Sequence, residues 1–464
     1  MTTSDVVIIG AGVVGCAIAR ELSATELSVI VVEAKGDVGD GTSKANTAIL
    51  HTGFDAKPGT LEASLVRRGY HLLGDYAELV GIPVERTGAL LVAWTDEQHE
   101  SLPGLRNKAI ANGYERCEIV DADEVYRREP QLGSGALGGL TVPDESIICP
   151  WTTTLAFATE AMARGARFLF NTRVTAVGVG TDGTTRVHAE GGRDLTCRWV
   201  INAAGLGSDV IDKFFGFDRF TITPRRGELL VFDKAARALV NSIVLPVPSK
   251  VGKGVLVSPT IYGNVMLGPT AEDLADRTNT ATSPSGFDFL VAKGRSLMPA
   301  LLEEEVTAAY AGLRAATEHA DYVVDIDNEK RYVCVGGIRS TGLTGSMAIA
   351  EHVRGLLEAA GVDVTPRREL PDPPLMPNIG EAFPRPYEQN DRIVSDGEYG
   401  RIVCFCERVS RGEIRDALNS ELPPSDLDGL RRRTRALMGR CQGFYCGAEV
   451  EALLDTALAE RGAR

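Results

Sequence analysis

The segment at residues 5–34 constrains the fold of this chain more than any other. It reads "DVVIIGAGVVGCAIARELSATELSVIVVEA": an apolar strand, a glycine turn, a helix and a second strand that ends in an acid. Gly10 permits the tight turn, Gly12 lets the backbone approach a pyrophosphate, and Gly15 allows the helix to pack closely on the strand. Glu33 stands where a carboxylate accepts the ribose hydroxyls of a dinucleotide, although an ordinary surface acid is the alternative interpretation. The pattern predicts a Rossmann-like α/β fold, and by itself it does not separate FAD from NAD.

Four cysteines near the C-terminus form the second constraint. Cys404 and Cys406 stand as C-x-C, and after a gap of 34 residues Cys441 and Cys446 stand as C-x4-C. Four thiolates on one small module suit a [2Fe-2S] cluster, which carries one electron at a time. Structural zinc usually takes cysteine pairs spaced C-x2-4-C, so zinc fits less well, and free or disulfide-bonded thiols are the third alternative.

The sequences around these cysteines, "CFCERVSRGEIRDAL" and "RRRTRALMGRCQGFYC", resemble the bacterioferritin-associated-ferredoxin-like [2Fe-2S] domain. The resemblance covers about residues 399–464 and implies that all four cysteines are cluster ligands. Such domains are often attached to flavin dehydrogenases. Glu413–Leu418 and Leu427–Met438 have helical character, which predicts a small helical domain.

Arginines crowd the second of these predicted helices and the turn after it. They invite three interpretations: attraction of an acidic partner, compensation of the negative charge of a thiolate-bound cluster, or a solvated helix face. The residues are Arg431, Arg432, Arg433, Arg435 and Arg440.

The stretch "GDGTSKANTAILHTGFDAKPGTLEASLV" resembles the flavin-contacting loop of the D-amino-acid-oxidase-like superfamily, and within it the glycerol-3-phosphate dehydrogenase and oxidase branch. The resemblance implies FAD as the cofactor, with Thr42, Ser43 and Asn46 near its pyrophosphate and ribityl chain. It also places His51 beside the flavin as a candidate base for a substrate hydroxyl. A histidine tuned near neutral pH suits that role. A purely structural histidine is the alternative.

Three later segments resemble further FAD contacts of the same superfamily: "FLFNTRVTAV", "RWVINAAGLGSDVI" and "YVCVGGIRSTGLTGSMAIAEHVRGLL". The last departs from the glycerol-3-phosphate branch at Arg339 and Thr341, which puts the exact substrate in question. The matching positions are Val174, Ala204, Gly205, Gly337, Gly342, Leu343 and Thr344.

Alternating apolar runs such as "GALLVAW" and "GELLVF" predict an antiparallel sheet in residues 86–145 and 216–325, an α+β substrate domain inserted between FAD-binding segments at about 1–85, 146–215 and 326–365. By resemblance, Lys253, Arg314 and Ser340 lie near the active site, where fixed cations would bind an anionic substrate. Solvated surface positions are the alternative for both cations. Residues 1–365 thus form the oxidoreductase domain, a proline-rich linker follows at 366–398, and the cluster domain occupies 399–464.

Composition excludes some classes of protein. The net charge of −14 argues against general nucleic-acid binding, and no apolar run approaches the roughly 18 residues of a membrane helix. Cys16, Cys117, Cys149, Cys197 and Cys334 are expected to be buried in a reducing compartment. We expect a cytoplasmic protein, with peripheral association at a membrane as a second option, and a homo- or hetero-oligomer as an open alternative.

Together these features predict an FAD-dependent dehydrogenase that oxidises a secondary alcohol bearing an anionic group. Oxidation of sn-glycerol 3-phosphate to dihydroxyacetone phosphate leads, with electrons passing through the cluster to an acceptor protein or a quinone-linked partner. Oxidation of a 2-hydroxy acid such as L-2-hydroxyglutarate, with which Arg339 is compatible, or of a secondary amine remains open. A non-catalytic electron-transfer subunit is the alternative from another class.

Overall fold

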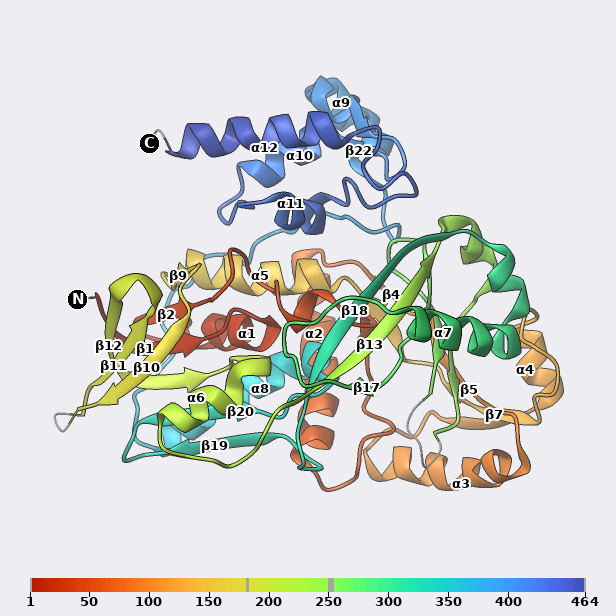
Figure 1. Cartoon of the computed structure of the whole chain (residues 1–464), viewed down its shortest axis with the longest axis horizontal. Helices are drawn as coiled ribbons and strands as arrows, with labels where there is room; N and C mark the ends of the chain where they lie inside the picture. The colour runs from red at the N-terminus through yellow and green to blue at the C-terminus, as the bar shows by residue number, and fades with distance from the viewer. Residues whose placement is uncertain (1, 181–182, 249–253, 463–464) are drawn as a thin grey trace.

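The computed structural model describes residues 2–180, 183–248 and 254–462. Its first sheet has the strand order β10-β11-β12-β1-β2-β9, with β20 beside β12 and β19 beside β20 (Figure 1). The strands β20, β12, β1, β2 and β9 run parallel, as the Rossmann-like prediction requires. Their bounds are β1 Thr2–Ile9, β2 Val29–Val32, β9 Arg167–Leu169, β10 Val174–Val179, β11 Thr185–Ala189, β12 Arg193–Asn202, β19 Val323–Asp327 and β20 Tyr332–Gly336.

Helices cover this sheet because its strands are apolar on both faces. The four residues of β2 are all buried, and Val29 and Val31 share one apolar cluster with Cys16 of α1 and Val353 of α8. The covering helices are α1 Val13–Leu22, α2 Leu61–Val80, α5 Pro150–Ala163, α6 Ser208–Phe214 and α8 Gly342–Ala359. The Rossmann-like prediction is confirmed, and the five cysteines outside the C-terminal domain are buried as expected.

The second sheet has the order β17-β13-β16-β15-β14-β5-β7-β6, with β18 paired to β13. Its neighbours are antiparallel except for the parallel pair β14 and β5, so the predicted antiparallel substrate sheet is confirmed with that one exception. The bounds are β5 Ala89–Ala93, β6 Glu118–Asp121, β7 Gly138–Val142, β13 Thr223–Phe232, β14 Ile243–Pro246, β15 Leu256–Pro259, β16 Val265–Gly268, β17 Glu272–Asp273 and β18 Val306–Ala316; the helices are α3 Asp96–Ala111, α4 Ala122–Arg128 and α7 Pro284–Leu297.

A three-stranded sheet in the order β3-β8-β4 joins the two halves of the molecule. Its strands are β3 Ile49–Leu50, β4 Val84–Glu85 and β8 Ser146–Ile148. Ile49 pairs with Ile147 and Leu50 with Ser146. The residues that follow β3 and precede β8 are thereby held next to one another.

The proline-rich segment is extended only in its first part. There Arg367 N–H donates to Ala24 O at 2.8 Å, and Met376 N–H donates to Val80 O at 2.8 Å. After it Arg385 is fully buried and pairs with Glu413 of the C-terminal domain at 2.8 Å, and helix α9 (Asn390–Ser395) follows. The later half of the predicted linker therefore packs as part of the C-terminal domain.

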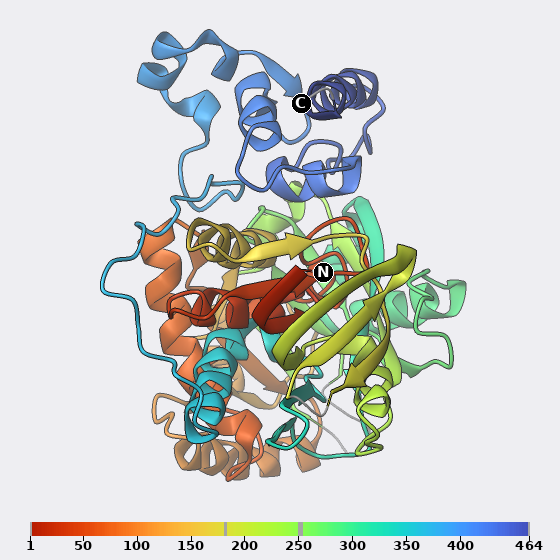
Figure 2. The same ribbon diagram turned by 90° about the vertical axis from the view of Figure 1, so that its left-hand side faces the viewer.

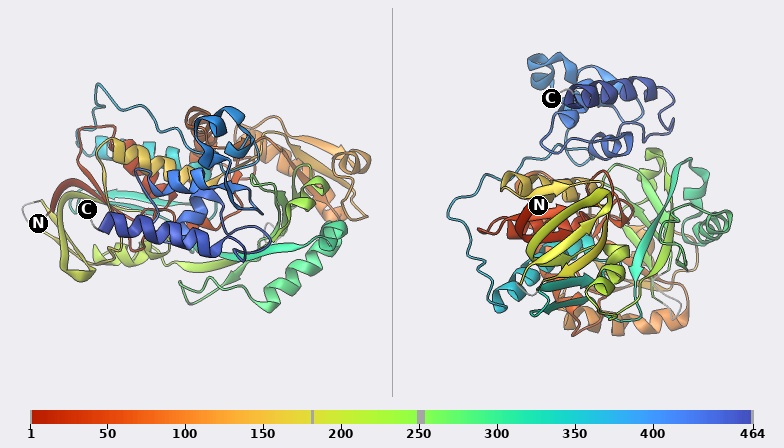
Figure 3. Two further views of the ribbon diagram at one scale, coloured as in Figure 1. Left: turned by 90° about the horizontal axis from the view of Figure 1, so that it is seen from above. Right: turned by 60° about the vertical axis from the view of Figure 1, so that its left-hand side comes forward.

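The C-terminal domain stands on the α5 side of the molecule, joined to the rest by that segment (Figures 2 and 3). It contains β21 Ile402–Cys404, β22 Val409–Ser410, α10 Arg411–Leu418, α11 Leu427–Thr434 and α12 Gly447–Gly462. Helix α10 begins at a capping box, in which the side chains of Ser410 and Glu413 each accept a hydrogen bond from the backbone N–H of the other residue. Helix α11 ends before the predicted Met438 because Arg435 adopts a left-handed conformation, φ 73°.

Candidate active site and cluster site

The glycine turn between β1 and α1 leaves no room for larger residues. A Cβ on Gly10, whose φ is +106°, would lie 2.5 Å from Ala203 O, and a Cβ on Gly15 would lie 1.9 Å from Gly10 O. Gly12 forms the N-cap of α1 in an extended conformation. The N-terminus of α1 therefore faces the glycine turn, as binding of a pyrophosphate would require, and that role of the turn stays a prediction.

Glu33 is half-buried at the end of β2. Its carboxylate accepts from Ala11 N at 2.7 Å and from Lys35 N at 2.9 Å. Burial raises the pKa of Glu33, and these two N–H groups partly offset that rise. The side chain is thus built into the glycine turn and is not a freely solvated surface acid. Its place at the mouth of the turn fits the ribose of FAD.

The loop after β2 holds the other predicted FAD residues. Ser43 Oγ accepts from Val13 N at 2.9 Å, which places this hydroxyl at the N-terminus of α1 where the pyrophosphate is expected. Thr42 Oγ1 donates to Leu313 O at 2.8 Å, and Asn46 Nδ2 donates to Ser43 O at 2.8 Å. The Ser43 hydroxyl therefore lies at the expected cofactor site, whereas the Thr42 side chain joins the loop to β18 and the Asn46 side chain bonds within the loop.

The later FAD segments meet this loop at the carboxyl ends of the parallel strands. Ala203 N–H donates to Ile9 O at 2.9 Å, so Ala204 and Gly205 lie beside the glycine turn. Thr172 N–H donates to Glu33 O at 2.7 Å, two residues before Val174 begins β10. These segments thus lie together on one edge of the sheet, the usual location of a cofactor in such folds, and their contacts with FAD stay a prediction.

The segment before α8 forms the last wall of this edge. Gly337 has a φ of +67°, and a Cβ on Gly342 would lie 2.8 Å from Ile338. Leu343 is buried in the first turn of α8. Thr344 Oγ1, one residue further, accepts from His51 N at 3.0 Å. The start of α8 therefore lies directly beside the predicted catalytic histidine.

His51 is oriented by a buried carboxylate that the sequence analysis missed. Its Nδ1 lies 3.1 Å from Glu145 Oε2, and Glu145 is 1% exposed. The other oxygen, Oε1, accepts from both N and Oγ1 of Thr52, at 2.7 and 2.8 Å. Because the carboxylate occupies Nδ1, Nε2 is the ring nitrogen that can take a proton from a substrate. The acid that precedes β8 in "PDESII" gave no local signal, since only the pairing of β8 with β3 brings it to His51.

The other residues predicted to lie near the substrate, Arg314, Ser340 and Lys253, differ in their surroundings. Arg314 lies on β18, partly buried, and its Nη2 donates to Thr270 O at 2.8 Å without an ion pair to any described carboxylate. Burial and the neighbouring Arg225 lower the pKa of Arg314, and the charge of Asp273 partly offsets this. Ser340 is exposed just before α8. Lys253 lies outside the described residues.

Arg339 and Thr341, where the sequence departs from the family loop, belong to an internal network. Arg339 Nη2 donates to Glu62 Oε2 and to Ala320 O, both at 2.8 Å. Thr341 Oγ1 donates to Glu62 Oε1 at 2.7 Å and lies 2.5 Å from the hydroxyl of Tyr322. Arg339 is therefore bound to Glu62 and joins the segment before α8 to α2. This weakens the interpretation of Arg339 as a partner for a substrate carboxylate.

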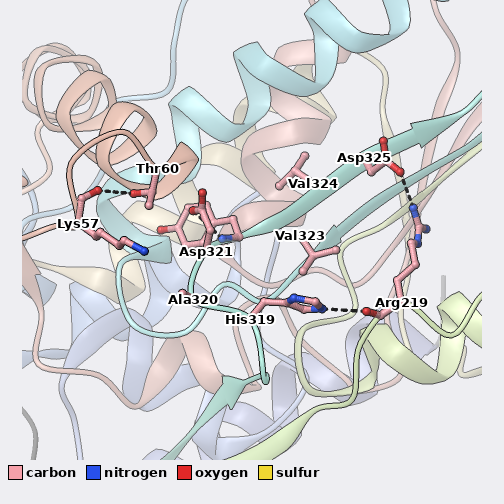
Figure 4. A pocket seen from close by; sticks show the side chains of 10 residues that line it. Lys57, Thr60, Arg219, His319, Ala320, Asp321, Val323, Val324 and Asp325 are labelled. Carbon is pink, nitrogen blue, oxygen red and sulfur yellow. Dashed lines mark hydrogen bonds and ion pairs between the residues drawn. The ribbon is translucent and has the colours of Figure 1, made fainter.

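A surface pocket of about 450 Å³ lies between the loop before α2 and strand β19 (Figure 4). Its lining includes Lys57, His319 and Arg219, but Arg219 is already paired with Asp325 at 2.9 Å. None of the predicted catalytic or cofactor residues lines this pocket. The pocket nevertheless adjoins the segment before α8, because a Cβ on Gly337 would lie 3.4 Å from Val323 N.

The four C-terminal cysteines approach one another as two pairs. The thiols of Cys406 and Cys441 lie within hydrogen-bonding reach, and so do those of Cys404 and Cys446. Backbone N–H groups of Tyr445, Gly443 and Phe444 lower the pKa of the Cys441 thiol, which favours a thiolate. Among the described residues no three potential ligands converge as they would on a single metal ion. Four thiols gathered in one small domain suit a [2Fe-2S] cluster.

Comparison with known proteins agrees with this geometry. Residues 5–356 match the family model "FAD dependent oxidoreductase", and residues 402–456 match "BFD-like [2Fe-2S] binding domain". The chain belongs to the FAD-dependent oxidoreductase family. It carries a BFD-like [2Fe-2S] domain at its C-terminus. Its cofactors are FAD and a [2Fe-2S] cluster, so the zinc and free-thiol alternatives fall away.

Individual relatives cover most of the flavoenzyme. It is 35% identical over 98% of its length to glycerol 3-phosphate dehydrogenase of Caloramator mitchellensis, whose own length is 94% covered. It is 32% identical to glycerol 3-phosphate oxidase of Mycoplasma pneumoniae, over 77% of this chain and 95% of the oxidase. The FAD-bound structure of the L-alpha-glycerophosphate oxidase from that organism matches with a TM-score of 0.75, at 29% identity over 81% of this chain and 98% of the oxidase.

Three of the five arginines considered, Arg432, Arg433 and Arg435, are buried and so do not form a solvated face, whereas Arg440 is exposed. Arg432 and Arg433 pair with Asp37 of the oxidoreductase domain, and Arg440 pairs with Asp233 at 2.9 Å. The acidic partner foreseen as one interpretation is therefore the rest of the same chain. None of the described helices combines the length and apolar character needed to cross a bilayer.

Proposed function

We propose that this flavoenzyme oxidises sn-glycerol 3-phosphate to dihydroxyacetone phosphate and delivers the electrons to an external acceptor. The observation that carries the chemistry is the pairing of His51 with the buried carboxylate of Glu145 beside the start of α8. The match with the Caloramator mitchellensis dehydrogenase over nearly the whole chain supports the substrate.

In this scheme neutral His51 keeps its proton on Nδ1, which donates a hydrogen bond to Glu145, and Nε2 takes the hydroxyl proton of the substrate. The negative charge of Glu145 then stabilises the imidazolium ion that forms. FAD, when bound, supplies the acceptor for the hydride of the same carbon, and the [2Fe-2S] cluster supplies a one-electron carrier. The protein's own contribution is to hold the base and the anionic end of the substrate at a fixed separation.

Arg314 is the proposed partner of the substrate phosphate. It follows Leu313, whose carbonyl accepts from Thr42 of the flavin loop, so its strand passes directly over the FAD edge. A partly buried guanidinium without a described carboxylate partner suits a phosphate dianion in a bidentate geometry. Lys253 and Ser340 remain proposed contacts on the basis of the family resemblance.

Three alternatives have less support. L-2-hydroxyglutarate dehydrogenase of Arabidopsis thaliana is 29% identical over 75% of this chain, but the arginine that suggested a carboxylate substrate is occupied by Glu62. A non-catalytic relay would need neither an oriented histidine nor Arg314. The likeness to L-proline dehydrogenase from P. horikoshii, at 21% identity, reflects a common fold.

Anaerobic mixing of the purified protein with candidate donors tests the proposal. sn-Glycerol 3-phosphate should bleach the flavin absorbance rapidly, whereas L-2-hydroxyglutarate and L-proline should leave it unchanged. Bleaching by L-2-hydroxyglutarate alone would replace the proposed substrate, and no bleaching by any donor would favour the relay.

We also propose that the acceptor is a protein that docks over the cluster loops. The Mycoplasma pneumoniae oxidase is almost fully covered by 77% of this chain, which leaves no counterpart for the C-terminal domain, whereas the dehydrogenase matches the chain throughout. Phe405, Phe444 and Tyr445 alternate with the cluster ligands and are 73%, 83% and 77% exposed. Aromatic side chains around a half-exposed redox site suit contact with another protein.

A further inference from the structure

Residues 37–44, the FAD loop, contact the cofactor edge on one side and the C-terminal domain on the other. Toward the cofactor, Gly39 N–H donates to Ala11 O at 2.8 Å in the glycine turn. Ser43 Oγ accepts from Val13 N at 2.9 Å at the start of α1. The conformation of this loop therefore determines the shape of the pyrophosphate site.

Toward the C-terminal domain, the FAD loop enters a buried ion-pair cluster formed by Asp37, Arg432 and Arg433. Asp37 accepts from Arg433 Nη1 and Nη2 at 2.6 and 2.8 Å and from Arg432 Nη2 at 2.9 Å. These side chains are only 4%, 4% and 7% exposed. Removing one member of such a buried group leaves an uncompensated charge, which is strongly unfavourable.

A second layer of charges extends this contact along the FAD loop. Arg432 Nη1 donates to Asp40 Oδ1 at 3.1 Å and to Asp428 Oδ2 at 2.6 Å. Lys44 Nζ donates to the same two carboxylates at 2.6 and 2.7 Å. The approach is so close that a Cβ on Gly429 of α11 would lie 2.7 Å from Asp37 Oδ2.

An aromatic contact continues from the end of the FAD loop to a cysteine-bearing loop. Trp151 Nε1 donates to Lys44 O at 3.0 Å, and the Trp151 and Tyr262 rings stack at 4.9 Å. The guanidinium of Arg435 lies 4.3 Å from the centre of the Tyr262 ring and donates to Glu407, the residue after Cys406, at 3.1 Å. The FAD loop and the cluster site are thus joined by an unbroken series of contacts.

We propose that docking of the C-terminal domain and retention of FAD are thermodynamically coupled through this loop, with Asp37, Arg432 and Arg433 as positioning residues. The docked domain fixes the FAD loop in the conformation that the cofactor needs. The loop therefore loses less conformational entropy when FAD binds. Coupling of two binding events is reciprocal, so bound FAD strengthens docking by the same factor. A chain without FAD therefore holds its C-terminal domain more loosely.

The rate of FAD release from the full-length protein tests this coupling. Arg433→Gln and Arg432→Gln should release FAD roughly tenfold faster than the wild type, or faster still. The fluorescence of the freed flavin after dilution measures the release rate. Arg440→Gln is the matched control, because its partners Asp233 and Glu305 lie outside the FAD loop. It should change the release rate less than about twofold if the loop carries the effect. Equal release from all four proteins would overturn the proposal.

Hydrogen exchange of the wild-type protein provides a test without substitutions. Addition of FAD to the FAD-free chain should slow exchange in residues 427–434, by the same factor of roughly tenfold, and leave α12 unchanged. Identical exchange of α11 in both forms would also overturn the coupling. Neither measurement uses a substrate, so their outcome is independent of which alcohol the enzyme oxidises.

Discussion

At the scale of single residues, the proposed chemistry depends on one nitrogen of His51. In His51→Ala the base is lost while the FAD edge of the sheet is untouched. We expect the variant to keep FAD and to reduce it about 10²–10⁴-fold more slowly with substrate, the range of a lost general base. Rapid mixing with sn-glycerol 3-phosphate, observed as flavin bleaching, measures this rate.

The contrary result would be equally clear. If His51 only supports the loop, His51→Ala should keep the bond to Thr344 Oγ1, because the backbone N–H of residue 51 makes that bond. The bleaching rate of the FAD-loaded variant would then remain near normal, and His51 would have no part in proton transfer.

Glu145→Gln removes the negative charge beside His51 while nearly keeping the size of the side chain. The amide oxygen can keep the two bonds from Thr52, but the amide NH2 then faces His51 Nδ1, so the negative charge is lost and the proton is favoured on Nε2, the nitrogen that must act as the base. We expect flavin reduction to slow by roughly 10–100-fold, less than in His51→Ala. Thr52→Ser, which retains both bonds to Glu145, is the control. A rate equal to the wild type would assign Glu145 to structure alone.

At the scale of elements, the turn between β1 and α1 should tolerate no side chain. In Gly15→Ala the new Cβ would lie 1.9 Å from Gly10 O, so strand and helix must separate. We expect loss of FAD and a free energy of unfolding lower by about 1–3 kcal/mol or more. Gly74→Ala in α2, where a Cβ meets no atom within 4 Å, is the matched control and should raise stability by about 0.5–1 kcal/mol. Urea unfolding and flavin absorbance report both quantities.

The elements that the sequence predicted correctly are those whose signals are local. The turn at Gly10 and the alternating strands of the second sheet follow from patterns a few residues long. The end of α11 was placed too late, because the left-handed conformation of Arg435 depends on its contacts with Tyr262 and Glu407, which are remote in sequence. Glu145, the partner of His51 and Thr52, was missed because it is also remote in sequence, 93 positions from Thr52.

At the scale of the whole molecule, the contact between domains joins residues 396 positions apart, Asp37 and Arg433, and no local pattern announces it. The arginines were visible, but their partner was not. Asp37 also makes this contact sensitive to acid. Burial alone would raise the pKa of Asp37, but the hydrogen bonds and charges of Arg433 and Arg432 outweigh it and hold the pKa below the usual 3.8.

A group with a lowered pKa stabilises the folded chain above its ordinary pKa, and that stabilisation is lost as the pH falls through the folded value. The wild type should therefore exceed Asp37→Asn in apparent free energy of unfolding by about 3–5 kcal/mol at neutral pH. The difference should persist down to about pH 4 and shrink below it. Urea titrations at a series of pH values measure it, and a difference that stays constant to about pH 3 would speak against the charge of Asp37 as its source.

The two redox sites of the molecule should be separable by one substitution in the cluster loops. Cys441→Ser removes a proposed cluster ligand, whose thiolate form is favoured by three backbone N–H groups. We expect the wild type to contain about two irons per chain. The variant should lose them, keep FAD, and be reduced by sn-glycerol 3-phosphate at a near-normal rate. Reduction of an added one-electron acceptor protein should slow severely, because electrons no longer have a one-electron carrier at the surface. Stopped-flow absorbance of the flavin and steady-state reduction of the acceptor give the two rates. If flavin reduction itself disappeared while FAD stayed bound, the cluster domain would have to take part in the oxidation of the alcohol.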